Sequence, residues 1–468
     1  MNGGYNLGYL LIHGTIITVD ERRRIIDDGA VAIEGREIVD IGKSEELLVR
    51  HKDKEIIDAS DSIIMPGLID CHVHLAQALI RGCADDLALV DWLSKRVWVL
   101  QGNYSAYEGR VSAELCLLEM IKSGTTTFAE TLLASRYGFD GIAEAVLQSG
   151  MRAALAKSIM DVSTYADRKN VMYPGMVEDK KACLQQALDL HARWEGSGDG
   201  RLSVWLGPRP LGSSSAALLK EVATLAREKQ MGIHIHFAEV QEDINFIQQN
   251  FGRQPAQLLA ELGVLGPRTL LAHGVWLTPE DIDIIREQGA TVVHNPSSNS
   301  KCASGICPVP ELLAAGVNVA LGCDGGPSNN TYDMFWEMKL TACLHKVNKL
   351  NPTVVPAERV IEMATINGAK ALGLEHLIGS LEPGKRADLI VIDCNKPHIV
   401  PNLNPVSTVV YAAQGQDVDT VFINGRPVMR QRQVQTMDEE MILTEATRAA
   451  RDLRARVGLD LGPRWPIY

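Results

Sequence analysis

The sequence lacks the features that mark several large classes of protein. Positive charge is not in excess, because 46 Lys and Arg residues stand against 58 Asp and Glu, for a formal net charge of −12. This balance gives no basic surface for nucleic acid and argues against an anionic membrane as a partner. No apolar run approaches the roughly 18 residues that span a bilayer. Small neutral or cationic molecules remain as ligands.

The nine cysteines also lack a pattern. They are scattered along the chain, form no CxxC pair and do not reach the density of a disulfide scaffold. The first residues are polar and rich in glycine and show no signal-peptide pattern. We therefore expect buried structural thiols and a cytoplasmic location, where thiols stay reduced.

Between residues 63 and 325, apolar β-prone runs alternate with amphipathic helical segments. The strand candidates are 63–75, 125–131, 152–160, 202–208, 232–239, 269–275, 290–296 and 319–325. Eight such repeats predict an α/β fold, a (β/α)8 TIM barrel. The 468 residues are enough for this barrel and a smaller accessory domain.

Short strands separated by turns occupy both ends of the chain. The N-terminal end contains a Glu-Gly-Arg turn at 34–36 between two β-prone runs, which is typical of a hairpin. Strand and turn patterns return after residue 379, so the simplest arrangement is one composite β-sandwich built from both ends. We assign 1–62 to its N-terminal part, 63–375 to the catalytic barrel, and 376–468 to its C-terminal part with a C-terminal helix and tail.

Polar side chains gather at the expected C-terminal ends of the strands. His72 and His74 are two residues apart, and side chains with this spacing project to the same face of a strand. The C-terminal ends of the strands meet at one face of a barrel, so we expect His236 and Asp324 to lie beside His72 and His74. Three imidazoles and a carboxylate suit a first-row divalent ion. We predict one such ion per chain, zinc in the first place, with iron or manganese as alternatives.

A divalent ion at this place makes hydroxide available near neutral pH, because it lowers the pKa of water towards about 7. Asp324 can accept the proton of that water. Glu239, three residues after His236, can donate a proton to a ring nitrogen or a leaving group. His273 can polarise an oxygen or stabilise developing charge.

The motifs around these residues resemble the amidohydrolase superfamily, specifically its cyclic-amidine deaminase and chlorohydrolase branch. The resemblance covers about residues 8–430 and appears in family order in PGLIDCHVH (66–74), SGTTT (123–127), HIHFAE (234–239), LAHG (271–274), HNPSSN (294–299), GCDG (322–325) and GSLEPGKRADL (379–389). It implies an aminohydrolase that replaces an amino group on an electron-poor C=N carbon by hydroxide. The implied substrate is a small N-heterocycle: a purine, pterin or pyrimidine base, or an s-triazine.

The resemblance also implies roles for individual residues and a homo-oligomeric state. Glu239 and His273 fall on the family's proton-transfer and polarising residues. The family's metal ligands fall on His72, His74, His236 and Asp324.

Two positions differ from the nucleoside deaminases of this branch. Gln101 stands where they carry a ribose-binding Glu, and Arg209 where they carry a His after Gly-Pro. An amide binds ribose hydroxyls less strongly than a carboxylate does, which disfavours a nucleoside. We expect Gln77 and Gln101 to hold a small polar ring and Arg209 to face a carbonyl or carboxylate.

Three further substrate-binding candidates are Trp92, Lys157 and His294. Lys157 can serve as a cation on the substrate side, as a plain salt-bridge partner, or at a second metal.

Two alternative functions stay open. The same site can act on a different leaving group (chloride, carbamate or urea), or on a nucleoside of the S-adenosylhomocysteine and methylthioadenosine type. A catalytically silent scaffold predicts lost ligands, and all the ligand residues are present.

Overall fold

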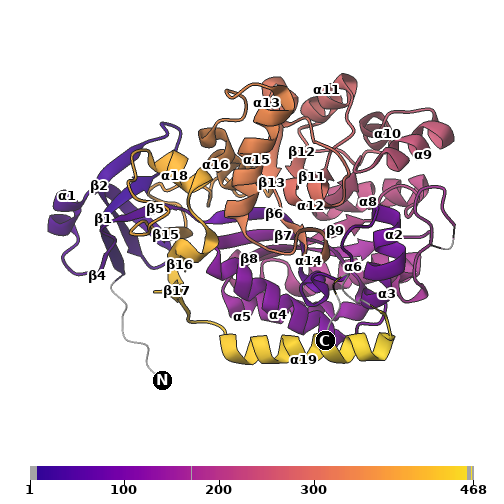
Figure 1. Ribbon diagram of the computed structural model, residues 1–468, viewed down its shortest axis with the longest axis horizontal. Coiled ribbons are helices and arrows are strands. Elements are labelled where there is room, and N and C mark those ends of the chain that lie inside the picture. The colour runs from indigo at the N-terminus through magenta and orange to yellow at the C-terminus, as the bar shows by residue number, and fades with distance from the viewer. Residues whose placement is uncertain (1–7, 170, 461–464, 466–468) are drawn as a thin grey trace.

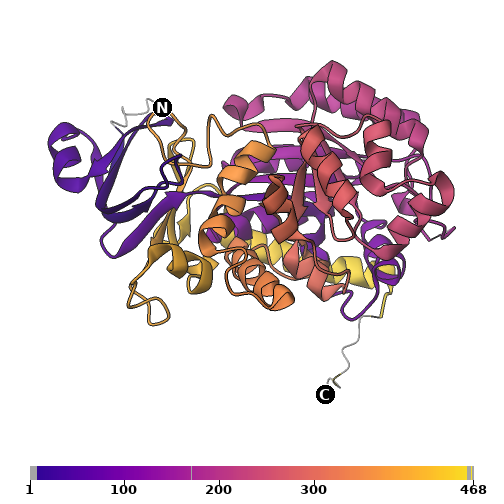
Figure 2. The same cartoon turned by 90° about the horizontal axis from the view of Figure 1, so that it is seen from above.

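The computed structural model describes residues 8–169, 171–460 and 465, and it places two sheets side by side (Figure 1, Figure 2). One sheet is mixed and comes from both ends of the chain, and the other is the parallel sheet of the barrel. The predicted fold, a (β/α)8 barrel beside a composite β structure, is confirmed. No helix within the described ranges is both long and apolar enough to cross a membrane.

The mixed sheet has the strand order β18-β17-β16-β15-β5-β1-β2-β3, with β4 paired to β1. Strands β15 and β5 are the junction between the two ends of the chain, with Leu389 opposite Pro66 and Asp393 opposite Ser62. Its strands are β1 (Tyr9–Ile17), β2 (Ile25–Glu34), β3 (Glu37–Lys43), β4 (Glu55–Asp58), β5 (Ser62–Pro66), β15 (Leu389–Asp393), β16 (Val418–Ile423), β17 (Arg426–Arg430) and β18 (Gln433–Val434).

The barrel sheet runs in the order β13-β12-β11-β10-β9-β8-β7-β6-β14. It closes because β13 and β14 are two pieces of the last strand: β13 pairs with β12, and β14 pairs with β6. The strands are β6 (Leu68–His74), β7 (Thr125–Leu133), β8 (Arg152–Ile159), β9 (Leu202–Pro208), β10 (Ile233–Phe237), β11 (Thr269–His273), β12 (Thr291–His294), β13 (Asn318–Leu321) and β14 (Asp324–Gly325).

The expected first barrel strand, 63–75, is in fact two strands. Residues up to Pro66 belong to the mixed sheet as β5, and the barrel begins at Leu68. Gly67 lies between them, where a Cβ atom would stand 2.2 Å from Cγ2 of Thr126. The chain passes from one sheet to the other at the one residue that has no side chain to clash.

Helices cover the outside of the barrel. The longer ones are α4 (Ala106–Lys122), α5 (Phe139–Ser149), α6 (Lys180–Trp194), α8 (Ala216–Lys229), α9 (Gln241–Phe251), α11 (Pro279–Gln288), α15 (Met334–Lys349) and α19 (Glu439–Val457). Helix α19 packs along α4 (Figure 1), and Arg456 of α19 pairs with Glu108 of α4 at 2.7 Å.

Short helices lie in the connections. They are α1 (Ser44–Arg50), α2 (Leu89–Trp92), α3 (Trp98–Gln101), α7 (Ser197–Gly200), α10 (Pro255–Glu261), α12 (Pro296–Lys301), α13 (Val309–Ala315), α14 (Gly326–Asn329), α16 (Ala357–Ala364), α17 (Ile366–Ala371) and α18 (Pro405–Tyr411). Those between β6 and β7 account for part of the long connection there.

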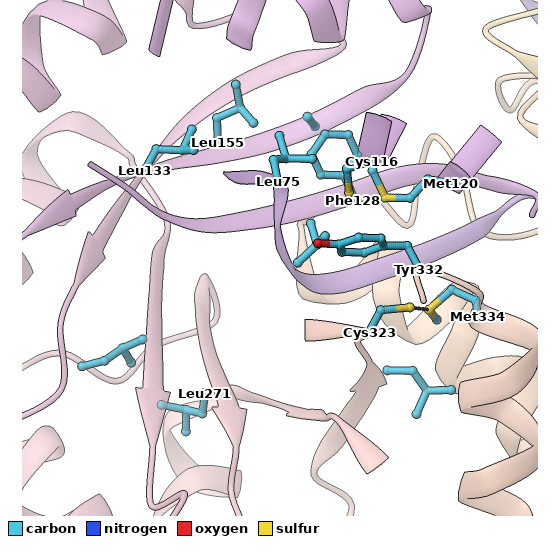
Figure 3. Close-up of a cluster of buried hydrophobic side chains, with 14 of the residues drawn as sticks. Leu75, Cys116, Met120, Phe128, Leu133, Leu155, Leu271, Cys323, Tyr332 and Met334 are labelled. Atoms are coloured by element: carbon cyan, nitrogen blue, oxygen red, sulfur yellow. Dashed lines mark hydrogen bonds between the residues drawn. The ribbon is translucent and has the colours of Figure 1, made fainter. Parts of the chain in front are cut away.

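The main core fills the space between the barrel strands and the surrounding helices. Figure 3 shows part of it, with side chains from strands, from α4 and from the segment after β14 in one cluster. Sγ of Cys323 lies 3.6 Å from Sδ of Met334 there. Tyr332, buried in the same cluster, donates its hydroxyl proton to the carbonyl oxygen of His74 at 3.0 Å. The core therefore reaches up to the strand end that carries the two predicted histidine ligands.

A buried ion pair joins the two sheets. Nη2 of Arg152, the first residue of β8, lies 3.3 Å from Oδ2 of Asp388, just before β15. The other oxygen of Asp388 accepts from the backbone N–H of Asn424 at 2.6 Å. The side chains of the pair are 4% and 2% exposed, so each charge depends on the other.

We expect the Arg152→Ala substitution to lower the free energy of unfolding by about 3–5 kcal/mol, because it leaves the Asp388 carboxylate buried without its cation. Equilibrium unfolding in urea measures the change. The control is Glu55→Ala, which removes the exposed pair between Glu55 and Arg430, whose atoms lie 2.7 Å apart. Its cost should be about 0–1 kcal/mol. Equal losses in the two variants would contradict a special role for the buried pair.

Candidate metal centre and active site

The four predicted metal ligands converge at the C-terminal ends of the barrel strands. Ligand atoms of His72, His74, His236 and Asp324 all lie within 4.8 Å of one another. Oδ1 of Asp324 is 3.2 Å from Nε2 of His74 and 3.4 Å from Nε2 of His72. The rings of His74 and His236 are stacked, with centroids 5.3 Å apart. These residues come from β6, β10 and β14, so barrel closure is needed to bring them together.

The protonation state of these side chains fits a cation. Burial lowers the pKa of His72 to about 4 and holds that of His236 well below its usual value, so both rings are neutral. Burial acts to raise the pKa of Asp324, but hydrogen bonds and charge from His72 and His74 hold it well below the ordinary range. Neutral imidazoles and an ionised carboxylate are the forms that bind metal.

An unpartnered ring nitrogen also fits a metal. Nε2 of His72 is buried, and its contact with Oδ1 of Asp324, itself a predicted ligand, is long at 3.4 Å and lacks good hydrogen-bond geometry. A buried polar atom left in this way is costly unless a ligand completes it. The donor set of three imidazoles and one carboxylate is that of a divalent metal site.

Neighbouring residues orient the ligands. Nδ1 of His72 lies 2.8 Å from Nε2 of His234, and Nδ1 of His74 lies 3.2 Å from the carbonyl oxygen of Thr131. With one ring nitrogen engaged, the other is directed at the centre of the cluster. The hydroxyl of Ser298 donates to Oδ2 of Asp324 at 2.5 Å.

His234 was not among the residues predicted to have a role, although the pattern around it contained a signal. His234 and His236 are two residues apart on β10 and project to the same face, as His72 and His74 do on β6. A second pair with this spacing indicates that both histidines of β10 project to the same side as those of β6, so His234 could have been chosen as a candidate for the site.

Glu239 and His273 stand beside the ligand cluster. Oε2 of Glu239 is 3.7 Å from Nε2 of His273, while Nδ1 of His273 lies 2.9 Å from Oδ1 of Asn299. Burial raises the pKa of Glu239 to about 7. Burial also disfavours the charged form of His273, but the carboxylates of Glu239 and Asp324 raise its pKa. The pair can store and transfer a proton near neutral pH.

The backbone is strained at two of these positions. His273 has a φ of 76° and Asp324 a φ of 64°, in the left-handed region that residues other than glycine rarely adopt. Strain of this kind is kept where the surrounding structure enforces it, commonly in active sites.

A cavity opens onto this cluster. The predicted substrate residues Gln77, Trp92, Gln101 and Arg209 line it. Most of its aromatic and apolar wall was not predicted from the sequence, because it comes from scattered strands, loops and helices; it includes Leu132, Trp98, Tyr137, Tyr165 and Met176. Such a lining, apolar with a few polar groups, is that of a site for a small molecule.

Lys157 and His294, also predicted to bind substrate, are not in the lining of this cavity. Nζ of Lys157 lies 3.1 Å from Oε1 of Glu178 and donates to the carbonyl oxygen of Ser158 at 2.6 Å. Nε2 of His294 lies 3.2 Å from Nε2 of His345. Both side chains are fully buried and in contact with these partners, and Lys157 stands in the role of a salt-bridge partner.

We expect His234→Ala to weaken divalent-ion binding about 10- to 100-fold, because the ring of His72 loses the partner that fixes its tautomer and orientation. Competition with a chromophoric chelator measures the affinity. The control is His345→Ala, which removes an equally buried histidine that is in contact with His294 instead. If both variants bound the ion alike, His234 would have no positioning role.

Comparison with known proteins agrees with this geometry. The model of the Amidohydrolase family matches residues 63–428. The 5'-deoxyadenosine deaminase of Methanosarcina acetivorans is 40% identical over 441 residues, which are 94% of this chain and 97% of the relative.

Solved structures are similar over nearly the whole chain. An adenosine deaminase from Xanthomonas campestris with bound zinc has a TM-score of 0.89 and 30% identity, covering 96% of this chain and 99% of its own. Atrazine chlorohydrolase from Arthrobacter aurescens, complexed with zinc, has a TM-score of 0.86 and 26% identity, covering 94% and 100%. The family match and the relatives agree with the ligand cluster at the barrel mouth, and the chain belongs to the Amidohydrolase family.

Proposed function

We propose that this protein is a metal-dependent hydrolytic deaminase that replaces the amino group on an electron-poor C=N carbon of a small N-heterocycle by hydroxyl. The observation that carries the proposal is Glu239, a buried carboxyl with a pKa of about 7, placed beside His273 and the ligand cluster. The deaminase relatives support it. His72, His74, His236 and Asp324 would hold a divalent ion, which would make hydroxide available near neutral pH by lowering the pKa of water.

Each residue at the site carries out a different part of the proton transfer. Asp324 accepts a proton from the attacking water. Glu239 gives its proton to the ring nitrogen as the C–O bond forms and then takes over the proton held by Asp324. It passes this proton to the amine as the C–N bond breaks, and the hydroxyl proton of the adduct returns to Glu239 as the C=O bond forms. Nε2 of His273 faces the developing charge on oxygen, its ring held at Nδ1 by Asn299. Water and the aminated ring become the oxo ring and ammonia.

The proton donor also favours an amine over chloride as the leaving group. Ammonia is expelled only after protonation, whereas chloride leaves as an anion. A buried acid beside the ligands is therefore needed for deamination and has less to do in dechlorination. The similarity to atrazine chlorohydrolase keeps a different leaving group as the second candidate.

We also propose zinc as the ion, with iron or manganese as alternatives, because three imidazoles and one carboxylate suit zinc and two similar structures contain it. All nine cysteines are free thiols and eight are buried, which supports a reducing cytoplasmic location. Assembly into a homo-oligomer stays a prediction.

We expect Glu239→Gln to lower the rate of ammonia release by about 10²- to 10⁴-fold, because the amide cannot donate and recover a proton. The variant should keep its divalent ion, since Glu239 is not in the ligand cluster. Coupled detection of ammonia measures the rate, and elemental analysis the metal content.

A matched control for this substitution is Glu242→Gln, which makes the same change three residues further on, outside the cavity lining. It should keep both rate and metal. Wild-type turnover in Glu239→Gln would refute the assigned proton transfer.

A further inference from the structure

Arg209 is a buried cation without a carboxylate partner. It follows β9 directly, lines the cavity, and is 6% exposed. Across the described residues, no ion pair forms to its guanidinium, and its Nε atom is buried without a hydrogen-bond partner. Burial lowers the pKa of this group, as expected when a charge is withdrawn from water.

The nearby groups do not neutralise this charge. The carboxylate of Glu178 influences Arg209 from a distance but is held by Lys157 at 3.1 Å. The guanidinium carbon of Arg209 lies 5.9 Å from the ring centroid of Trp98, and such a contact offsets only part of the desolvation. Arg152, which is also buried, has the carboxylate of Asp388 beside it. Unlike Arg152, Arg209 has no carboxylate partner among the described residues.

The geometry of the guanidinium group of Arg209 indicates which partner it would bind. A guanidinium presents parallel N–H donors that match two acceptors side by side, as in a carboxylate or in the carbonyl and ring nitrogen of an oxopurine. An adenine edge, which offers an amino group beside a ring nitrogen, is matched by an amide instead. Gln77 lines the same cavity, and its Oε1 atom is buried without a partner.

We propose that Arg209 determines specificity by binding a carbonyl or carboxylate oxygen of the substrate. This inference rests on the proposed function and narrows it: the aminated ring carries an oxo group, or its substituent carries a carboxylate. The ring oxo group and the carboxylate would both accept hydrogen bonds from the guanidinium group. Neutral aminated rings without such an oxygen are poor substrates, because they leave the buried charge of Arg209 unpaired.

Pairs of compounds that differ in the relevant oxygen test the proposal. Isoguanine with adenine, guanine with 2-aminopurine, and cytosine with 4-aminopyrimidine differ in one ring oxo group. S-adenosylhomocysteine and 5'-methylthioadenosine share the adenine ring, and only the former carries a carboxylate. Ammonia release by the metal-loaded enzyme gives kcat/KM for each, and binding to the Glu239→Gln protein, measured by calorimetry, gives affinity without turnover.

We expect the oxygen-bearing member to be preferred in at least one pair by about 100-fold or more, as for sites built around a polar group of the substrate. The pair that shows the preference identifies the source of the oxygen. Arg209→Met should reduce that preference to within threefold. Arg268→Met is the control, because Arg268 also stacks on a tryptophan, 5.5 Å from the ring centroid of Trp205, but lies outside the cavity lining. It should keep the preference.

Thermal unfolding separates this role from a structural one. Arg209→Met removes an uncompensated buried charge, so its Tm should equal or exceed that of the wild type. A structural arginine would lower Tm when replaced. A fall in Tm larger than that of Arg268→Met would overturn the proposal.

The remaining outcomes are distinguishable. If no oxygen-bearing compound is bound or deaminated better than its partner, or if the preference survives in Arg209→Met, the proposal fails even when ammonia is released. If the binding preference depends on Arg209 but no compound yields ammonia, the proposed deamination fails and the recognition stands.

Discussion

The pairing of the last barrel strand with the first is the constraint on which the site depends. Asp324 of β14 lies opposite Val73 of β6, and Gly325 opposite His74. One buried carboxylate oxygen, Oδ1 of Asp70, accepts from the backbone N–H groups of both His72 and Cys323 at 3.1 Å. This bridge fixes the carboxylate ligand beside the two histidines that lie about 250 residues earlier in the chain.

Packing at this junction is close on both sides of the ligand and leaves no room for a side chain at residue 322. A Cβ atom on Gly325 would lie 1.7 Å from Oε1 of Gln77, and one on Gly322 would lie 2.7 Å from Cβ of His72. The strained backbone of Asp324 is therefore held by neighbours that leave no room for another arrangement. The same packing places Gln77, which lines the cavity, against the strand that carries the ligand, so the ligand cluster and the cavity wall share one piece of rigid structure.

The sequence allowed the fold and the ligand cluster to be predicted because both follow from local rules. Apolar runs mark the strands, and residues at strand ends meet at one face of a barrel. The rule does not separate cavity residues from supporting ones where the partner of a side chain is distant: Lys157 and His294 are also on barrel strands, but they contact Glu178 and His345. Nothing near Lys157 in the sequence reveals this. Likewise, Pro66-Gly67 marks a break in the run from 63 to 75, but a break alone does not reveal that the strands on its two sides join different sheets.

The chemistry of the site and its choice of substrate depend on different physical conditions. For the ligands and Glu239, other residues of the fold compensate for the cost of burial. The imidazole rings are neutral, the carboxylate of Asp324 is paired with histidines, and Glu239 has a pKa of about 7. Arg209 is buried without a group that compensates its charge. An unpaired guanidinium in the cavity destabilises the free protein, and this loss of stability is offset only when a bound molecule pairs with the charge. Members of a family can therefore share one hydrolytic centre and still differ in substrate, because recognition is left to groups whose partners arrive with the ring.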